Sequence, residues 1–166
     1  MTAPTAAPER LLHVRVHGDP VGQGAVSGGG MRVGKGGKTY HQPQYHTNRA
    51  LLEPWRERVI ADVRLALPRW DIAAPLDGAL SLSAVFWMPR GKTVKRDEPT
   101  VPPDLDHLLR ALGDALTKAG AIADDARITT FGRVSKRYAD HEHPPGVSFY
   151  LETDPGGVAD DVGAAA

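Results

Sequence analysis

The 166-residue chain contains no cysteine, which excludes disulfide bonds, thiol catalysis and cysteine-based zinc sites. It also has no apolar run near the ~20 residues that a membrane-spanning helix needs. The first ten residues are rich in alanine and proline and lack the apolar core of a signal peptide. No Gly-x-x-x-x-Gly-Lys-Ser/Thr motif follows a predicted strand, so we expect no nucleotide cofactor. These absences predict a cytoplasmic protein without a membrane segment.

The formal net charge is zero, but the charges are unevenly distributed along the chain. Residues 1–103 hold 14 lysines and arginines against 9 acidic residues, a net +5, whereas residues 141–166 carry −5. The block between them is neutral. A basic first part is typical of proteins that contact nucleic acids, although overall neutrality weakens that case because phosphate attraction supplies most of the affinity.

Residues 104–125, DLDHLLRALGDALTKAGAIADD, are the most informative segment of the sequence. Leucines recur at helical spacing and form one apolar stripe: Leu105, Leu108, Leu109, Leu112 and Leu116. Asp104 is placed to cap the helix, and Gly120 is placed to end it. At about 100° per residue, Asp106, Arg110 and Asp114 share an arc of roughly 80° on the opposite face. The segment therefore predicts an amphipathic helix with a charged outer face.

The segment holds four carboxylates that could meet, namely Asp104, Asp106, Asp114 and Asp125. If the strand that follows runs back beside the helix start, Asp104, Asp106 and Asp125 converge. Clustered carboxylates repel one another and favour a hard divalent ion, above all Mg²⁺. A purely structural role for these aspartates stays open as an alternative, because aspartates are common at helix N-termini and an Asp–Arg–Asp row is often a solvated ion-pair face.

The remaining pattern predicts one α+β domain over residues 11–152, a mixed β-sheet packed against two main helices. Alternating residues predict strands at 11–17, 79–87, 127–138 and 146–152, and helical spacing predicts a second helix at about 48–67. Most arginines of that helix, at positions 49, 56, 58 and 64, are expected on a solvated face. We expect disorder in residues 1–10 and in the acidic tail, 153–166.

Two basic segments are candidates for DNA contact. Residues 21–37 are glycine-rich and predict a mobile loop, which could order on DNA phosphates or be a floppy surface hairpin. Its candidate contacts are Arg32, Lys35 and Lys38. The second segment lies just before Asp104 and supplies Arg90, Lys92, Lys95 and Arg96, which suit contacts to the DNA backbone rather than to bases.

Residues 103–125 resemble the signature of the RusA family of Holliday-junction resolvases. The likeness rests on Pro103-Asp104-Leu105-Asp106, then Asp114-Ala115-Leu116, Gly120 and the closing Asp124-Asp125. The turn Gly18-Asp19-Pro20-Val21-Gly22-Gln23-Gly24 fits a form that such proteins often carry after their first strand.

The resemblance implies a homodimer that cuts two opposed strands of four-way junction DNA, in recombination and repair. It implies that Asp104, Asp106 and Asp125 are catalytic and bind Mg²⁺, for which Mn²⁺ could substitute, and we add Asp114 in support. It also implies a nucleoid-associated protein of phage or prophage type. His107 stands where the family usually has asparagine, and Arg110 stands where it has an important lysine.

Arginine cannot give up its proton, so Arg110 could only bind phosphate or offset charge. His107 fits a DNA contact, a contact around a metal, or a neutral surface histidine. These departures keep a second hypothesis open, a protein of the same fold that binds branched DNA without cutting it. A third hypothesis is a metal-dependent transferase that uses the Asp-x-Asp motif, although the chain is short for a nucleotide-sugar domain.

Overall fold

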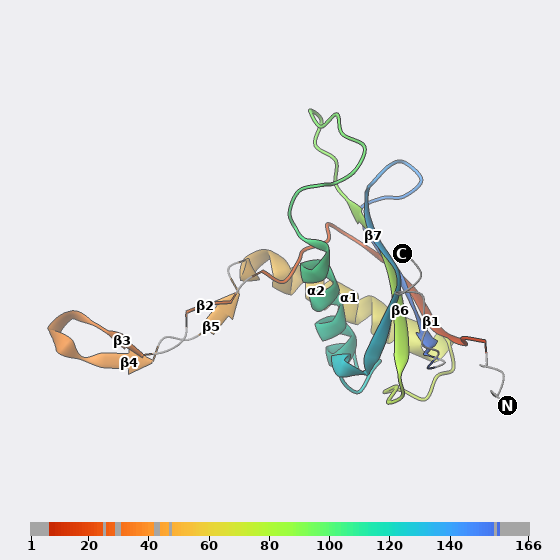
Figure 1. Cartoon of the computed structure of the whole chain (residues 1–166), viewed down its shortest axis with the longest axis horizontal. Helices are drawn as coiled ribbons and strands as arrows, with labels where there is room; N and C mark the ends of the chain where they lie inside the picture. Colours follow the sequence, from red (N-terminus) through yellow and green to blue (C-terminus); the bar gives the residue numbers. More distant parts are fainter. Residues whose placement is uncertain are drawn as a thin grey trace, which may run out of the picture.

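The computed structural model describes residues 7–24, 26–28, 31–41, 44–46, 48–154 and 156. Its centre is a four-stranded sheet in the order β1-β8-β6-β7, with helices on one side (Figure 1). The four strands are β1 (Arg10–His17), β6 (Leu80–Met88), β7 (Ile128–Tyr138) and β8 (Gly146–Thr153). β6 and β7 are parallel, and the other pairings are antiparallel. The expected α+β fold with a mixed sheet is confirmed.

Two long helices, α1 (Arg49–Ala66) and α2 (Leu105–Ala119), pack against each other, and α1 also packs on β1. The apolar stripe of α2 is buried as its spacing predicts, with Leu108, Leu112 and Leu116 at most 1% exposed. Gly120 ends α2 in the left-handed conformation, at φ 78°. Three short 3₁₀ turns complete the described elements: η1 (Lys35–Gly37), η2 (Leu67–Arg69) and η3 (Asp125–Arg127).

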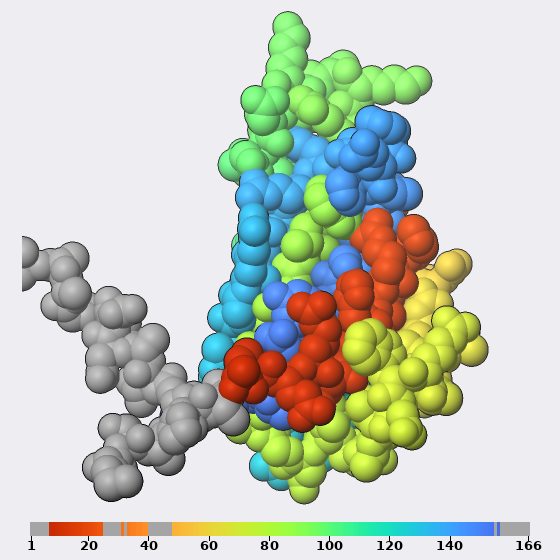
Figure 2. Space-filling view, turned by 90° about the vertical axis from the view of Figure 1, so that its right-hand side faces the viewer, coloured from red at the N-terminus to blue at the C-terminus, as the bar shows by residue number. Residues whose placement is uncertain are grey.

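The helices cover only one face of the sheet. Along β6, Leu80, Leu82 and Phe86 are buried against the helices, whereas Ser81 and Val85 are only half-buried on the other face. Figure 2 shows this second face, where the four strands lie side by side with no helix over them. The edge strands of the sheet are β1 and β7, and the two helices lie across the face between these edges.

The glycine-rich segment is not a plain loop where the structure describes it. Two antiparallel pairs, β2 (Val26–Gly28) with β5 (Gln44–His46) and β3 (Met31–Val33) with β4 (Thr39–His41), form a two-stranded arm that projects from the body (Figure 1). Of the two alternatives left open by the sequence, the antiparallel pairs agree with a surface hairpin, whose short β-type runs are obscured by the glycines between them.

The strands extend one residue beyond each end of the expected domain, since β1 begins at Arg10 and β8 ends at Thr153. The backbone of Glu9 is hydrogen-bonded to Thr153 in both directions. The expected disorder of residues 1–6 and 157–166 falls outside the described residues. Among the described helices, none combines the length and the hydropathy needed to cross a bilayer.

Candidate active site

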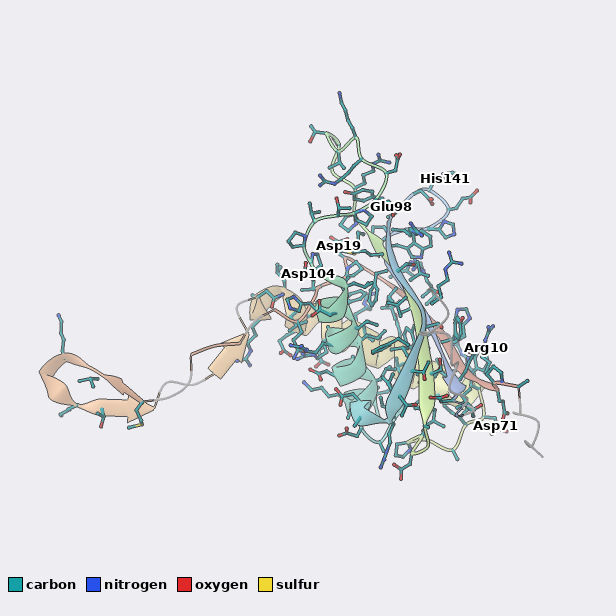
Figure 3. All side chains as sticks on the ribbon, viewed as in Figure 1. Arg10, Asp19, Asp71, Glu98, Asp104 and His141 are labelled. Carbon is teal, nitrogen blue, oxygen red and sulfur yellow. The ribbon has the colours of Figure 1, made fainter. Side chains whose placement is uncertain are left out.

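The first turn of α2 presents an acidic group that the fold leaves unused. Asp104 is the N-cap residue, with the extended backbone (φ −71°, ψ 151°) that this position requires. Its side chain nevertheless accepts no capping hydrogen bond from any residue of the described chain. Figure 3 shows Asp104 at the upper end of α2, below the loop that carries Glu98. The carboxylate is therefore free to bind something other than the helix.

Asp106 and His107 complete a compact donor group with Asp104. One ligand atom from each of the three side chains lies within 4.8 Å of the others. His107 Nε2 is 3.8 Å from Asp106 Oδ2, and the two side chains are 34% and 69% exposed. Sequence reasoning had kept several roles open for His107, and the structure places its imidazole among the carboxylates. Its position three residues after Asp104, on the same side of the first turn, is the signal that could have indicated this.

Asp125 faces the same side of α2 from the turn after it. A hollow of about 240 Å³ is lined by Asp106, Arg110 and Asp125 together with Leu109, Gly113, Ile128 and Phe131. A Cβ built on Gly113 would lie 3.4 Å from the Cβ of Asp125, so Asp125 stands against the middle of α2. Gly113 lies seven positions after Asp106 in the helix, a rise of about 10 Å. The hollow therefore runs along α2 from Asp106 to Asp125, and the carboxylates do not all converge on one place.

The neighbouring Asp124 has a structural role, because it caps a 3₁₀ turn. Its Oδ1 accepts a 2.9 Å hydrogen bond from the backbone N–H of Ala126 and so caps the 3₁₀ turn η3. This bond fixes the turn from which Asp125 projects, and it explains in physical terms why two successive aspartates occur there.

Asp114, expected beside the metal, points toward α1 instead. Its Oδ2 lies 3.3 Å from Arg56 Nη2, and it does not line the hollow that holds Asp106 and Asp125. Arg56 is 3% exposed, so the prediction of a solvated face was wrong at this position. Arg56 also donates to Glu53 Oε1 at 3.1 Å and to Gln23 Oε1 at 2.8 Å. These partners explain how a buried guanidinium is tolerated.

The turn Gly22–Gln23–Gly24 is packed onto the start of α2. The backbone N–H of Gln23 donates to the carbonyl of His107 at 2.9 Å, and the Gln23 side chain accepts from Arg56. A Cβ on Gly22 would lie 2.9 Å from the Cβ atoms of both His107 and Pro103. Such a distance is essentially never seen, so only glycine fits here without a shift. Sequence reasoning noted this turn but did not foresee its contact with the acidic group.

The turn is also the base of the arm. Asn48, the residue before α1, donates through Nδ2 to the carbonyl of Gly22 and accepts through Oδ1 from the N–H of Gly24. Asn48 thus ties together the points where the chain leaves for the arm and returns from it. The arm and the acidic group share one anchoring structure.

Lys136 of β7 fixes the segment that leads into Asp104. Its Nζ donates to the carbonyls of Val101 and Pro103, both at 2.8 Å. Charge-assisted bonds of this length hold the backbone firmly. The position of Asp104 is therefore set by a strand at the far side of the hollow as well as by its own helix.

The proposed DNA-contacting residues occupy two separate places. Lys35 and Lys38 are exposed on the arm, and the side chain of Arg32 lies outside the described residues. Lys92 and Lys95 belong to the loop after β6 and make no hydrogen bond or ion pair with another described residue. Arg90 and Arg96 instead brace that loop, since they donate to its carbonyls and to Tyr138. The loop therefore presents its two lysines from a braced base.

Comparison with known proteins identifies the family of the chain. The family model described as endodeoxyribonuclease RusA matches residues 32–147, a span that contains α1, β6, α2, β7 and all four aspartates. No curated protein matches the chain. The matched span is well over half of the sequence, and the RusA family comprises endonucleases that resolve Holliday junctions by hydrolysing phosphodiester bonds. The chain therefore belongs to the RusA family of endodeoxyribonucleases.

Proposed function

We propose that this protein is a divalent-metal-dependent resolvase that cuts four-way DNA junctions by paired, symmetric nicks. The observation that carries the proposal is the donor group of Asp104, Asp106 and His107, whose ligand atoms lie within 4.8 Å of one another at the edge of a hollow. The hollow also presents Arg110 and Asp125, so opposite charges face the same space.

The donor chemistry fits Mg²⁺ or Mn²⁺. Two carboxylates with exposed side chains are hard oxygen ligands, which both ions prefer, and the capping role that could have engaged Asp104 is not used. His107 adds a nitrogen, a donor that suits a transition metal better than Mg²⁺. Asp125 is the proposed third catalytic carboxylate, held on the opposite side of the hollow. Asp114 supports the site through its ion pair with Arg56.

Asp104, Asp106 and His107 would hold the divalent ion, which would supply an acidified water and offset the charge of the phosphate. The residues of the chain supply orientation, phosphate binding and proton transfer. Asp104 and Asp106 orient the site, and Arg110, which keeps its proton, binds a phosphate oxygen and stabilises charge in the transition state. Asp125 is placed to hold or accept a proton on the other side of the hollow. Lys92, Lys95 and the arm lysines Lys35 and Lys38 hold the DNA backbone, with Arg32 as a further candidate.

Paired nicks need two active sites, and one chain contains one donor group in its described part. We therefore propose a homodimer, in which each protomer cuts one of two opposed strands of the junction. Such an enzyme acts on recombining DNA in the cytoplasm at the nucleoid, in a bacterial host or from a phage genome.

Two residues support a second candidate function, the binding of branched DNA without cleavage. Arg110 and His107 depart from the family signature, and a chain without the family lysine could bind branched DNA without cutting it. Both Asp104 and Asp106 are retained, which favours the enzyme over this alternative.

The test is cleavage of an end-labelled synthetic four-way junction in Mg²⁺, with a matched linear duplex and the Asp104→Asn protein beside it. We expect symmetric nicks on the junction alone and their loss in the variant, with junction binding retained. Junction binding with no cleavage in Mg²⁺ or Mn²⁺ would support the non-catalytic alternative. Cleavage by Asp104→Asn at the wild-type rate would remove Asp104 from the site.

A further inference from the structure

A second hollow, of about 450 Å³, lies at the opposite edge of the sheet from the acidic group. It is formed between β1 and the outer side of α1 with the turn after it, and its principal lining residues are His17, Arg15, Arg58, Asp62, Arg69 and Trp70. We refer to it as the β1–α1 hollow. It shares no residue with the hollow that holds Asp106 and Asp125.

The β1–α1 hollow contains three arginines against one carboxylate, Asp62, and none of the arginines forms an ion pair with a described residue. Arg58 and Arg69 form no ion pair with any carboxylate of the described chain, and neither does Asp62 with a cation. This contrasts with Arg10, Arg56 and Arg127, each of which has a carboxylate within 4.0 Å. Guanidinium groups that share a hollow repel one another, and an anion that enters it relieves the repulsion.

Arg15 adds an unsatisfied donor to the same place. Its Nη2 donates to the carbonyl of Pro144, but its Nη1 is buried and has no hydrogen-bond partner in the described structure. Burial lowers the pKa of the Arg15 guanidinium below its usual value, the direction expected for a desolvated cation without a counter-charge. Buried donors without partners are uncommon in proteins, and a turn of the Arg15 side chain toward the hollow would let a bound oxygen acceptor satisfy this one.

Trp70 gives the hollow an aromatic wall. It is 37% exposed, one of the few large apolar side chains on the surface of the described chain. An exposed indole beside guanidinium groups is the combination that binds nucleic acids, because arginine contacts phosphate and the ring stacks on a base or sugar. An acidic protein segment would use the cations equally well but would not need the ring.

We infer that the β1–α1 hollow is a second DNA-backbone site, which holds a junction arm away from the point of cleavage. The inference rests on the proposed function only in requiring that the chain binds branched DNA. The two sites lie toward opposite edges of the sheet, the acidic hollow beside β7 and the second hollow at β1, so only a junction arm that extends beyond the metal site would contact both.

The test measures junction affinity as a function of salt for the full-length chain and for the Arg58→Gln/Arg69→Gln double variant. Junctions with long and with truncated arms are compared, in Ca²⁺ to support binding while cleavage is followed separately in Mg²⁺. Because each phosphate contact contributes about 0.9 to the slope of log affinity against log salt, we expect the variant's slope to be shallower by about 2 on long arms. On arms too short to reach the hollow, variant and wild type should bind equally. The cleavage rate at saturating protein should not change.

Two controls separate this effect from others. Arg10→Gln removes one positive charge from β1 at a residue that already pairs with Glu152, so the salt slope of this variant should stay near wild type. Trp70→Leu should lose the quenching of tryptophan fluorescence that long-armed DNA produces in the wild-type protein. Trp55 is only 6% exposed and provides an internal reference.

An unchanged salt slope and affinity in the double variant would overturn the inference and make an acidic protein the better occupant of the hollow. An equal loss of affinity on long and truncated arms would overturn it too, because it would place the contact at the junction centre. A wild-type chain that binds the junction without cutting it would count against the proposed catalysis alone and leave this binding test decisive. A chain that binds no DNA would overturn both.

Discussion

Arg56 Nη2 of α1 lies 3.3 Å from Asp114 Oδ2 of α2 and joins the two helices behind the acidic group. The same guanidinium reaches Gln23, whose backbone N–H donates to the carbonyl of His107. One buried cation thus connects α1, the turn at the base of the arm and the first turn of α2. The arrangement makes Arg56 a positioning residue for the site rather than a surface charge.

Asp114→Asn distinguishes two roles for Asp114, an ion pair with Arg56 and a contribution to the metal site. If it acts through Arg56, cleavage should be retained within a few-fold while stability falls by about 1–3 kcal/mol, less than for a fully buried pair because Asp114 is one-third exposed. Chemical denaturation and junction cleavage measure the two effects on one preparation. A protein of wild-type stability that no longer cleaves would return Asp114 to the metal site.

His107→Asn should shift metal preference toward Mg²⁺. The imidazole offers a nitrogen donor, whereas the asparagine side chain offers an oxygen, and Mg²⁺ prefers oxygen. We expect the ratio of cleavage rates in Mn²⁺ and Mg²⁺ to fall by a measurable factor, with the circular dichroism spectrum unchanged. An identical ratio in the two proteins would exclude His107 from the metal's surroundings.

Gly22→Ala should disturb the site by crowding it, without removing any group that could bind a metal or DNA. The added Cβ would meet the Cβ atoms of His107 and Pro103 at 2.9 Å, so the turn must shift, at a cost of about 1–3 kcal/mol. Cleavage should fall because the first turn of α2 moves with it. Gly78→Ala is the matched control, since a Cβ there meets no atom within 4 Å of the described structure. Equal behaviour of the two variants would contradict the proposed packing.

Lys136→Met should lower the rate of cleavage more than DNA affinity. Methionine keeps the apolar stem but loses the donors that hold the carbonyls of Val101 and Pro103, so the segment before Asp104 is no longer fixed. Single-turnover cleavage at saturating protein isolates the rate, and Lys136→Arg should restore part of it. A loss confined to affinity would mean that Lys136 contacts DNA instead.

Asp140 makes a predictable contribution to stability in acid. Hydrogen bonds from the backbone N–H groups of His143 and Glu142 hold the pKa of this exposed carboxyl below its ordinary value of 3.8. A depressed pKa adds stability above about pH 3.8, and this stability is lost as the pH falls through the folded value. The wild type should therefore melt above Asp140→Asn at neutral pH, and the gap should close below pH 3.8. A gap that persists or widens in acid would contradict this assignment.

The fold could be predicted in large part because its signals are local. Leu108, Leu112 and Leu116 repeat at helical spacing, and β6 alternates, so burial follows from the period of each element. Asp104 and Gly120 mark the helix ends because capping depends on a few adjacent residues. For the arm, a hairpin was one of two alternatives, and its strands could not be located because they are stabilised by pairing across the ribbon, which no local pattern records.

The sequence by itself determined the chemistry of this protein: the acidic group at the start of α2, the helix that carries it and the family to which the chain belongs. Only the tertiary structure decided where each charge points. It turned Asp114 toward Arg56, set Asp125 against Gly113, placed His107 close to Asp104 and Asp106, and left Arg58 and Arg69 of the β1–α1 hollow without an ion pair in the described structure. The reason is physical. Spacing along a helix fixes which residues share a face, whereas the partner that each face meets depends on segments distant in the chain.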